Sequence, residues 1–218
     1  TWTVAGIPPA TDYQVCVVVS DLAGNTAEDC NSPITIWGTD ATAPTVDLAS
    51  IASPNKGDIV LSAAAADPES GIQKVEFFYK KVGDPAYTLI YSDISAPYTA
   101  TWDSTGVNGE VLFKAVATNG VGTVAEDIFG PVLIDNTLPV VGDVSPAAGN
   151  LAGSVIFSAP VTDVPSGIAS VVFEYGLDVE GEWVFAPIGA GTYNAGTGKY
   201  DAPAWDTTAF ADGTEVKI

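Results

Sequence analysis

The 218-residue chain contains no histidine, no arginine and no methionine, and it has only two cysteines. Without histidine there is no imidazole to activate a serine nucleophile, to bind a metal ion or to titrate near neutral pH. Two cysteines are few for a disulfide-stapled miniprotein, and a zinc site would need more thiols or a histidine. These absences exclude a serine–histidine triad and every metal site built on histidine.

Positive charge is also scarce, because seven lysines oppose 27 acidic residues and leave a formal net charge of −20. Such a chain repels polyanions, so we expect no nucleic-acid partner. Apolar residues make up 47% of the chain, which is enough for packed cores. Asp, Gly, Pro or Ser interrupts every apolar run before it could cross a bilayer, so we expect no membrane segment. The acidic surface is either simply solvated or collects cations.

Internal similarity with a period near 100 residues organises the chain. Trp102 and Trp205 open the related segments Trp-Asp-Ser-Thr and Trp-Asp-Thr-Thr. The other matching pairs are 57–63 with 153–159, 67–72 with 163–168, 19–29 with 117–127, and the linkers 39–44 with 134–139, at spacings of 96, 96, 98 and 95 residues. We therefore expect tandem repeats rather than one continuous globule.

The repeat pattern sets the expected boundaries. Residues 1–40 are the C-terminal part of one repeat, 41–135 are a complete repeat, and 136–218 are a third repeat that lacks its last strand. We interpret both ends as cuts in a longer array. Alternatively, a strand from a neighbouring copy or another surface protein completes the unfinished repeat.

Within each repeat the apolar residues alternate with a period of two. The alternation runs through 59–65, 75–79 and 13–19, and turn residues such as Asn108-Gly109 separate the runs. Strict alternation places one face of each strand in a core and the other toward water. Roughly seven short strands per repeat are typical of an immunoglobulin-like sandwich. The sequence thus predicts an all-β chain of tandem immunoglobulin-like β-sandwich domains, arranged as beads on a string.

The repeated motifs resemble a known family. The segments Asp-x-x-Ser-Gly-Ile, Trp-Asp-Thr-Thr and Asp21-Leu22-Ala23-Gly24-Asn25 resemble bacterial immunoglobulin-like modules found in tandem in surface, S-layer and adhesin proteins. Residues 7–15 resemble the end of a fibronectin type III domain. The resemblance implies a non-catalytic structural or adhesive role, extracellular or at the cell surface. The alternative is a spacer in a large secreted enzyme that degrades polysaccharide or protein.

The two cysteines flank one predicted turn. Cys16 and Cys30 lie on the strands on either side of residues 21–25, so direct pairing of these strands puts them within disulfide reach. A disulfide would fit an oxidising compartment, and two free thiols are the alternative.

Carboxylates are plentiful enough for catalysis or metal binding to need consideration. Asp67 and Glu69 could form an acid/base pair, but the third repeat has Pro165 where Glu69 stands, so we expect no enzyme. Calcium prefers carboxylate, amide and carbonyl oxygens, and we expect no other cofactor. Solvated loops are the alternative to calcium sites. The candidate calcium ligands are Asp21, Asp40, Asp67 and Glu69 near the first junction, and Asn119, Asp135, Asn136 and Asp163 near the second.

The tryptophans divide into repeated and single ones. Trp102 and Trp205 recur in the repeats, which favours packing in a core. Trp37 and Trp183 do not recur, and either could offer an exposed platform for a glycan.

Overall fold

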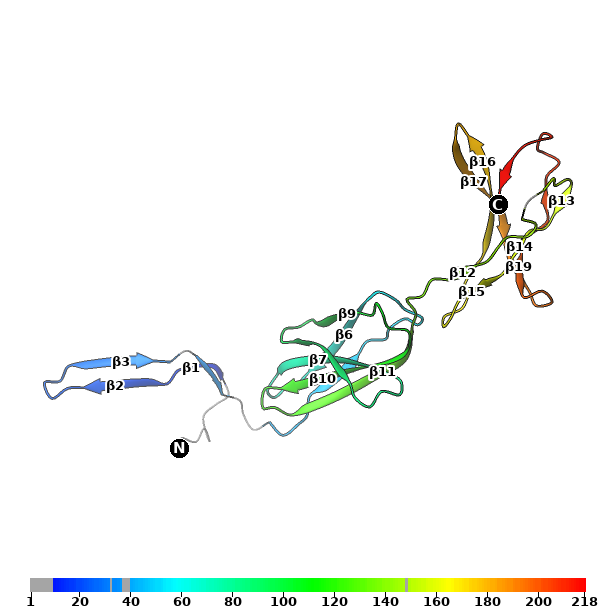
Figure 1. Ribbon diagram of the computed structural model, residues 1–218. Helices are drawn as coiled ribbons and strands as arrows, with labels where there is room; N and C mark the ends of the chain where they lie inside the picture. Colours follow the sequence, from blue (N-terminus) through cyan, green and yellow to red (C-terminus); the bar gives the residue numbers. More distant parts are fainter. Residues whose placement is uncertain (1–9, 32, 37–39, 148) are drawn as a thin grey trace. The chain divides into compact units, whose positions relative to one another are not determined.

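The computed structural model describes residues 10–31, 33–36, 40–147 and 149–218, and every regular element among them is a β-strand (Figure 1). In that part of the chain no helix is long and apolar enough to cross a membrane. The chain divides into two compact units, one of residues 1–105 and 110–132 and one of residues 106–109 and 133–218. An all-β architecture agrees with the alternation in the sequence.

The N-terminal part forms two small antiparallel pairs. Strand β1 (Ala10–Tyr13) pairs with β4 (Ile34–Ile36), and β2 (Cys16–Ser20) pairs with β3 (Thr26–Cys30). The sequence predicts that Val15, Val17 and Val19 face a core, but their side chains are 50%, 63% and 59% exposed. The alternation does not lead to burial there: every residue of β2 and β3 is exposed, and among the described residues each of these strands pairs only with the other.

The central repeat is a sandwich of seven strands. They are β5 (Thr45–Leu48), β6 (Asp58–Ala66), β7 (Ile72–Lys81), β8 (Thr88–Asp93), β9 (Tyr98–Asp103), β10 (Gly109–Asn119) and β11 (Val124–Ile134). One sheet has the order β5-β6-β9 and the other β11-β10-β7-β8. This two-layer arrangement is the immunoglobulin-like sandwich that the sequence predicts.

The core of this sandwich follows from the alternation. Ile59 and Leu61 of β6 are 2% and 1% exposed, and Val75, Phe77 and Phe113 of the facing sheet are fully buried. Their neighbours in sequence point outward, as in β6, where buried and exposed residues alternate. Each buried apolar side chain of this size stabilises the fold by about 1.5–3 kcal/mol relative to an exposed one.

Gly130 interrupts β11 for a steric reason. Its φ is +126°, and a Cβ added there would lie 2.9 Å from the carbonyl oxygen of Val111 on the neighbouring strand. Only glycine accommodates both the backbone angle and this close approach.

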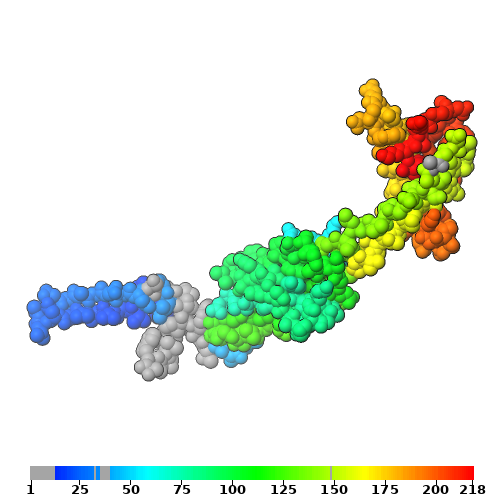
Figure 2. All heavy atoms as spheres, viewed as in Figure 1, coloured from blue at the N-terminus to red at the C-terminus, as the bar shows by residue number. Residues whose placement is uncertain are grey.

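The third repeat contains shorter strands. They are β12 (Val140–Val141), β13 (Ser154–Val155), β14 (Ser158–Ala159), β15 (Val161–Thr162), β16 (Val172–Val179), β17 (Glu182–Ala190), β18 (Thr192–Asn194), β19 (Lys199–Asp201), β20 (Trp205–Asp206) and β21 (Val216–Lys217). The segment that matches the single strand β6 is divided into three, and Pro160, which has no N–H to donate, separates two of them. The turn between β16 and β17 projects away from the other strands of its unit (Figure 2).

A small core holds the third repeat together. Phe157, Ala159, Phe173 and Ala202 are buried, and the partly buried Trp205 packs against this cluster. The indole of Trp205 lies 4.9–6.1 Å from three aromatic rings, measured between ring centroids, and these rings are Tyr175, Phe210 and Phe157.

The repeated Trp-Asp-Ser/Thr motif has one structural role in both repeats. Ser104 donates from its backbone N–H and its Oγ to the carbonyl oxygen of Gly57, at 3.0 and 2.7 Å. Thr207 makes the same two contacts with Gly153, at 2.9 and 3.0 Å. The motif therefore places a Trp in the core and fastens the following turn to the strand opposite.

Candidate functional site

A polar cluster binds the linker that precedes the central repeat. It consists of Asp40 and Thr42 from the linker, Asp67 and Ser70 from the loop between β6 and β7, and Asn119 at the end of β10, and we call it the central linker cluster. Asn119 and Ser70 are 0% and 1% exposed, and Asp67 is 8% exposed. Polar groups buried to this extent need hydrogen-bond partners.

The loop between β6 and β7 is built around Asp67. Its Oδ1 accepts the backbone N–H groups of Glu69 at 2.9 Å and Ser70 at 2.8 Å. The Ser70 N–H, followed by the Asn119 side chain, lowers the pKa of Asp67 below its ordinary value of 3.8. Asp67 is therefore a charged acceptor that shapes its own loop, which accounts for the Asp-x-x-Ser motif.

The linker residues bind this loop directly. The Ser70 Oγ donates to Asp40 Oδ2, and the Thr42 Oγ1 donates to Glu69 Oε2 at 2.6 Å. The Thr42 N–H in turn donates to Asp40 Oδ1 at 3.0 Å. These contacts hold residues 40–42 against the start of the repeat that they precede.

Asn119 lies at the centre of the cluster. Its Nδ2 is 2.8 Å from Asp40 Oδ2, 3.0 Å from Asp67 Oδ2 and 3.3 Å from the carbonyl oxygen of Thr42. One amide nitrogen thus faces two carboxylate oxygens and a carbonyl oxygen.

The turn after Asn119 determines which way its amide points. Asn119 Oδ1 accepts the N–H groups of Val121 and Thr123, at 3.2 and 2.8 Å, so Nδ2 must face the carboxylates. The turn after Asp21 has the same pattern, since Asp21 Oδ1 accepts the N–H groups of Ala23 and Asn25 at 2.9 and 2.8 Å. The second oxygen of Asp21 accepts the amide of Asn25, so Asp21 is engaged within its own turn.

An equivalent cluster binds the linker that precedes the third repeat. Asp135 Oδ2 accepts the Ser166 N–H at 2.9 Å, and its Oδ1 accepts the N–H of Thr137 at 3.0 Å and the Thr137 hydroxyl. Thr137 first and Ser166 second hold the pKa of Asp135 far below its ordinary value. Asp163 Oδ2 accepts the Ser166 Oγ at 2.9 Å, whereas its buried Oδ1 has no hydrogen-bond partner among the described residues.

Asn136 binds a different part of the same unit. Its side-chain Nδ2 donates to the carbonyl oxygen of Val107 at 2.9 Å, and its backbone N–H donates to Asn108 Oδ1 at 2.7 Å. These two contacts join Asn136 to Val107 and Asn108, and neither involves the carboxylate of Asp135 or Asp163.

The candidate calcium ligands are thus grouped differently from the sequence-based sets. Asp40, Asp67 and Glu69 of the first set lie together with Asn119 of the second, whereas Asp21 of the first set is bound within its own turn. Asp135 and Asp163 meet through Ser166. The signal that could have placed Asn119 is strand direction, because antiparallel order returns the end of β10 to the end of the sandwich where β6 finishes.

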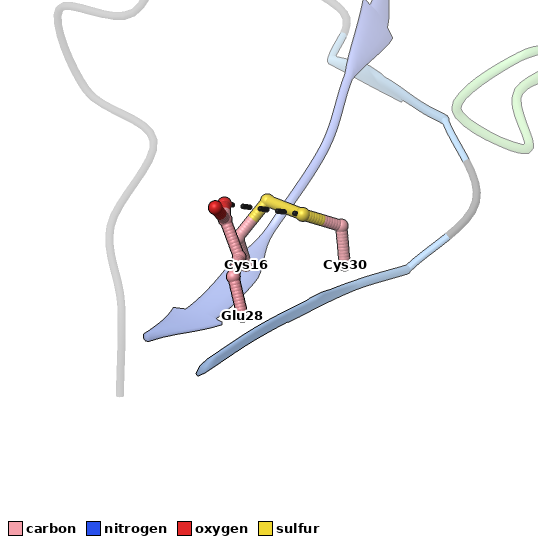
Figure 3. Close-up of side chains that lie close together, drawn as sticks. All are labelled: Cys16, Glu28 and Cys30. Carbon is pink, nitrogen blue, oxygen red and sulfur yellow. Dashed lines mark hydrogen bonds between the residues drawn. A yellow bond between two sulfur atoms is a disulfide. The ribbon is translucent and has the colours of Figure 1, made fainter. Parts of the chain in front are cut away.

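The two cysteines belong to neither linker cluster and lie on the N-terminal ribbon of β2 and β3. Cys16 and Cys30 are directly paired residues of β2 and β3, and a disulfide joins them (Figure 3). Glu28 Oε1 lies 3.4 Å from the Sγ of Cys30, on the same exposed ribbon. A disulfide sulfur carries no proton, so this contact places a negative charge beside the bridge without a hydrogen bond to it.

Of the two tryptophans predicted as glycan platforms, only Trp183 lies among the described residues. Trp37 lies outside the described residues. Trp183, on β17, is 40% exposed, and the Lys217 Nζ lies 5.6 Å from the centroid of its ring.

The family model described as bacterial Ig domain matches residues 44–125. This segment is similar to a bacterial Ig domain. The match covers strands β5 to β10 and the beginning of β11. A search of curated proteins finds no match to the chain.

Several solved structures are similar to the chain. The fibronectin(III)-like modules of Clostridium thermocellum CbhA are 25% identical, with a TM-score of 0.40 over 75% of this chain and 80% of that one. The tetra-tandem repeat in the extending region of a large adhesion protein is 20% identical, with a TM-score of 0.37 over 96% of this chain and 52% of that one.

A third structure comes from an Antarctic bacterium. It is described as a Ca²⁺-stabilized adhesin that helps the bacterium reach out and bind ice, and it is 20% identical, with a TM-score of 0.35 over 95% of this chain and 54% of that one. The present chain therefore spans about half the length of the two adhesin structures.

Proposed function

We propose that the chain is a non-catalytic structural segment of an extracellular or cell-surface adhesin, in which Ig-like repeats space other parts of the protein. The observation that carries the proposal is that each described linker is bound by the repeat that follows it, through equivalent residues. Asp40 binds Ser70 in the central repeat, and Asp135 binds Ser166 in the third repeat. A module that orders its own linker suits an array that must hold a defined spacing.

Two further properties support this role. The disulfide between Cys16 and Cys30 lies on an exposed ribbon, and such bridges persist in oxidising compartments. The net charge of −20 favours the solubility of an exposed chain. Neighbouring copies or other surface proteins are the partners that we propose for such an array.

The location can be tested with an antibody raised against the exposed turn at residues 178–182. We expect this antibody to label intact, unpermeabilised cells that make the protein, and brief protease treatment of those cells to remove the signal. Labelling that requires cell lysis would contradict the proposal. An antibody against a cytosolic protein controls for leakage.

Spacing modules in a secreted enzyme that degrades polysaccharide or protein are the second candidate function. The observation that favours it is the same ordered linker, which would serve equally well to separate a catalytic domain from its anchor. The complete coding sequence distinguishes the two. A catalytic domain in the same polypeptide supports the enzyme, and further repeats with an anchor support the adhesin.

We also propose that calcium binds at the linker of the third repeat. Asp135 and Asp163 approach each other through Ser166, and the buried Asp163 Oδ1 is an acceptor without a partner in the described part of the chain. A cation would satisfy that oxygen and offset the repulsion between the carboxylates.

The calcium proposal predicts a higher melting temperature in millimolar calcium than in EDTA, because an ion that binds only the folded state stabilises it. The Asp163→Asn variant should lose this difference. The control is Asp143→Asn, which removes the same charge at an exposed position and should keep the difference. An equal response of both variants would mean that calcium acts only through the general acidity of the surface.

A further inference from the structure

The central linker cluster differs from a calcium site in one respect, and the difference concerns Asn119. This inference rests on the proposed spacer function, because it concerns how the linker of a repeat is held in place. We infer that the Asn119 amide takes the position of a metal ion in the central linker cluster, so that this linker is ordered without calcium.

The Asn119 amide places a neutral hydrogen-bond donor among oxygens of the kind that a cation would bind. Nδ2 lies within 3.0 Å of one oxygen from each of Asp40 and Asp67, and 3.3 Å from the carbonyl oxygen of Thr42. Two carboxylates and a carbonyl are the ligand types that calcium selects, at distances of about 2.3–2.6 Å. Two N–H bonds bearing partial positive charge lie where such an ion would have to lie.

Burial makes these hydrogen bonds to the carboxylates necessary. Asn119 is 0% exposed and Asp67 is 8% exposed, so water offsets only part of the repulsion between Asp67 and the partly buried Asp40. Charges in such surroundings are tolerated only when hydrogen-bonded or paired. Nδ2 contacts both carboxylates at once, and no lysine contacts either of them in the described part of the chain.

The N-terminal repeat shows what a carboxylate does at the same turn position. Asp21 is 98 residues before Asn119, and its Oδ1 accepts the same two turn N–H groups that Asn119 Oδ1 accepts. The turn therefore folds with Asp as well as with Asn. Asn119→Asp should keep the turn and change only the outward-facing atom, from a donor to a third acceptor beside Asp40 and Asp67.

The experiment compares Asn119→Asp with the unchanged chain in EDTA and in millimolar calcium. The readout is hydrogen–deuterium exchange of peptides from β7 and β10, which reports the stability of the central repeat alone. In EDTA we expect exchange in the variant to be faster by about tenfold or more, because Asp67 Oδ2 and the Thr42 carbonyl oxygen lose the Asn119 donor while a third carboxylate is added beside Asp40 and Asp67. In calcium we expect exchange to return toward that of the unchanged chain, since the position becomes a cation site.

Two controls separate the role of the amide from other effects. Asn119→Ala removes the donor without adding a carboxylate, so its exchange should be fast in both solutions. Asn150→Asp adds the same charge at an exposed position and should behave as the unchanged chain. If Asn119→Asp does not fold in EDTA, circular dichroism should show that calcium folds it.

Three results would overturn the inference. They are slower exchange of β7 and β10 in the unchanged chain when calcium is added, unaltered exchange of Asn119→Asp in EDTA, and failure of calcium to restore or fold that variant. None of these results bears on where the protein is located, so the proposed function and this inference fail separately.

Discussion

The rings of Trp102 and Tyr79 lie 4.5 Å apart, centroid to centroid, and join the two sheets of the central sandwich. Trp102 belongs to β9 and Tyr79 to β7, and Phe113 of β10 meets the same indole edge-on at 5.3 Å. The recurring Trp is therefore the residue around which the two layers close.

Truncating Phe113, which packs on Trp102, should destabilise the central repeat. Phe113 is fully buried, so Phe113→Ala removes its apolar surface from the core and leaves a cavity against Trp102. We expect the free energy of unfolding in urea to fall by about 3–5 kcal/mol. Tyr91→Ala, at a side chain that is 54% exposed, should change it by less than about 1 kcal/mol. Equal effects would show that the layers do not close on Trp102.

A second prediction concerns Gly130. Gly130→Ala should lower the free energy of unfolding by more than about 1 kcal/mol, because the new methyl group meets the Val111 carbonyl as well as an unfavourable φ. Gly122→Ala is the matched control, since Gly122 also has a positive φ (+91°) but nothing lies within 4 Å of the added Cβ. Chemical denaturation of both variants measures the difference, and a Gly122 effect as large as that of Gly130 would contradict the steric explanation.

A third prediction concerns acid. The folded-state pKa values of Asp67 and Asp135 lie below the ordinary 3.8, so near pH 4 the folded chain binds fewer protons than the unfolded chain. Their contribution to stability is therefore complete above about pH 4 and is lost as the pH falls through the folded-state values. Thr137→Val removes the hydroxyl donor to Asp135 and should raise the pKa of Asp135 in a carbon-detected NMR titration. Asp67 serves as the internal control and should titrate as before.

A fourth prediction concerns the disulfide. Reduction requires a thiolate to attack a sulfur, and the Glu28 carboxylate 3.4 Å from the Cys30 Sγ repels that anion. Glu28→Gln should speed reduction by glutathione by about two- to fivefold at low salt, and less by the cationic thiol cysteamine. Glu182→Gln makes the same charge change away from the bridge and should have no effect. A rate increase that is independent of salt and of reductant charge would rule out repulsion as the cause.

Burial could be predicted from the sequence where it depends on the strand pattern alone, and not where it depends on a second sheet that covers the strand. Alternation alone located the buried faces of Ile59, Leu61 and Val75, because a strand in a closed sandwich buries every second residue. The same alternation in β2 did not lead to burial, because a strand pattern does not supply the sheet that should cover it.

The linker clusters were predictable only where their contacts are local in the sequence. Spacing identified Asp40 with Asp135 and Ser70 with Ser166, since these contacts are local to one linker and the next loop. The place of Asn119 beside Asp67 depends on the order of the strands in space, which spacing does not encode. Its amide direction depends in addition on the turn hydrogen bonds of Val121 and Thr123.

The strand order of the central repeat has a mechanical consequence. The chain enters at Thr45, which pairs with Ala66 near the 67–71 loop, and it leaves at Ile134, at the far end of β11 from the turn that joins β11 to β10. A force applied to these two ends acts along the strands, so the bonds of the β5–β6 and β10–β11 ladders are loaded together in shear instead of opening one after another. A domain tethered at these two ends resists extension until many bonds fail at once.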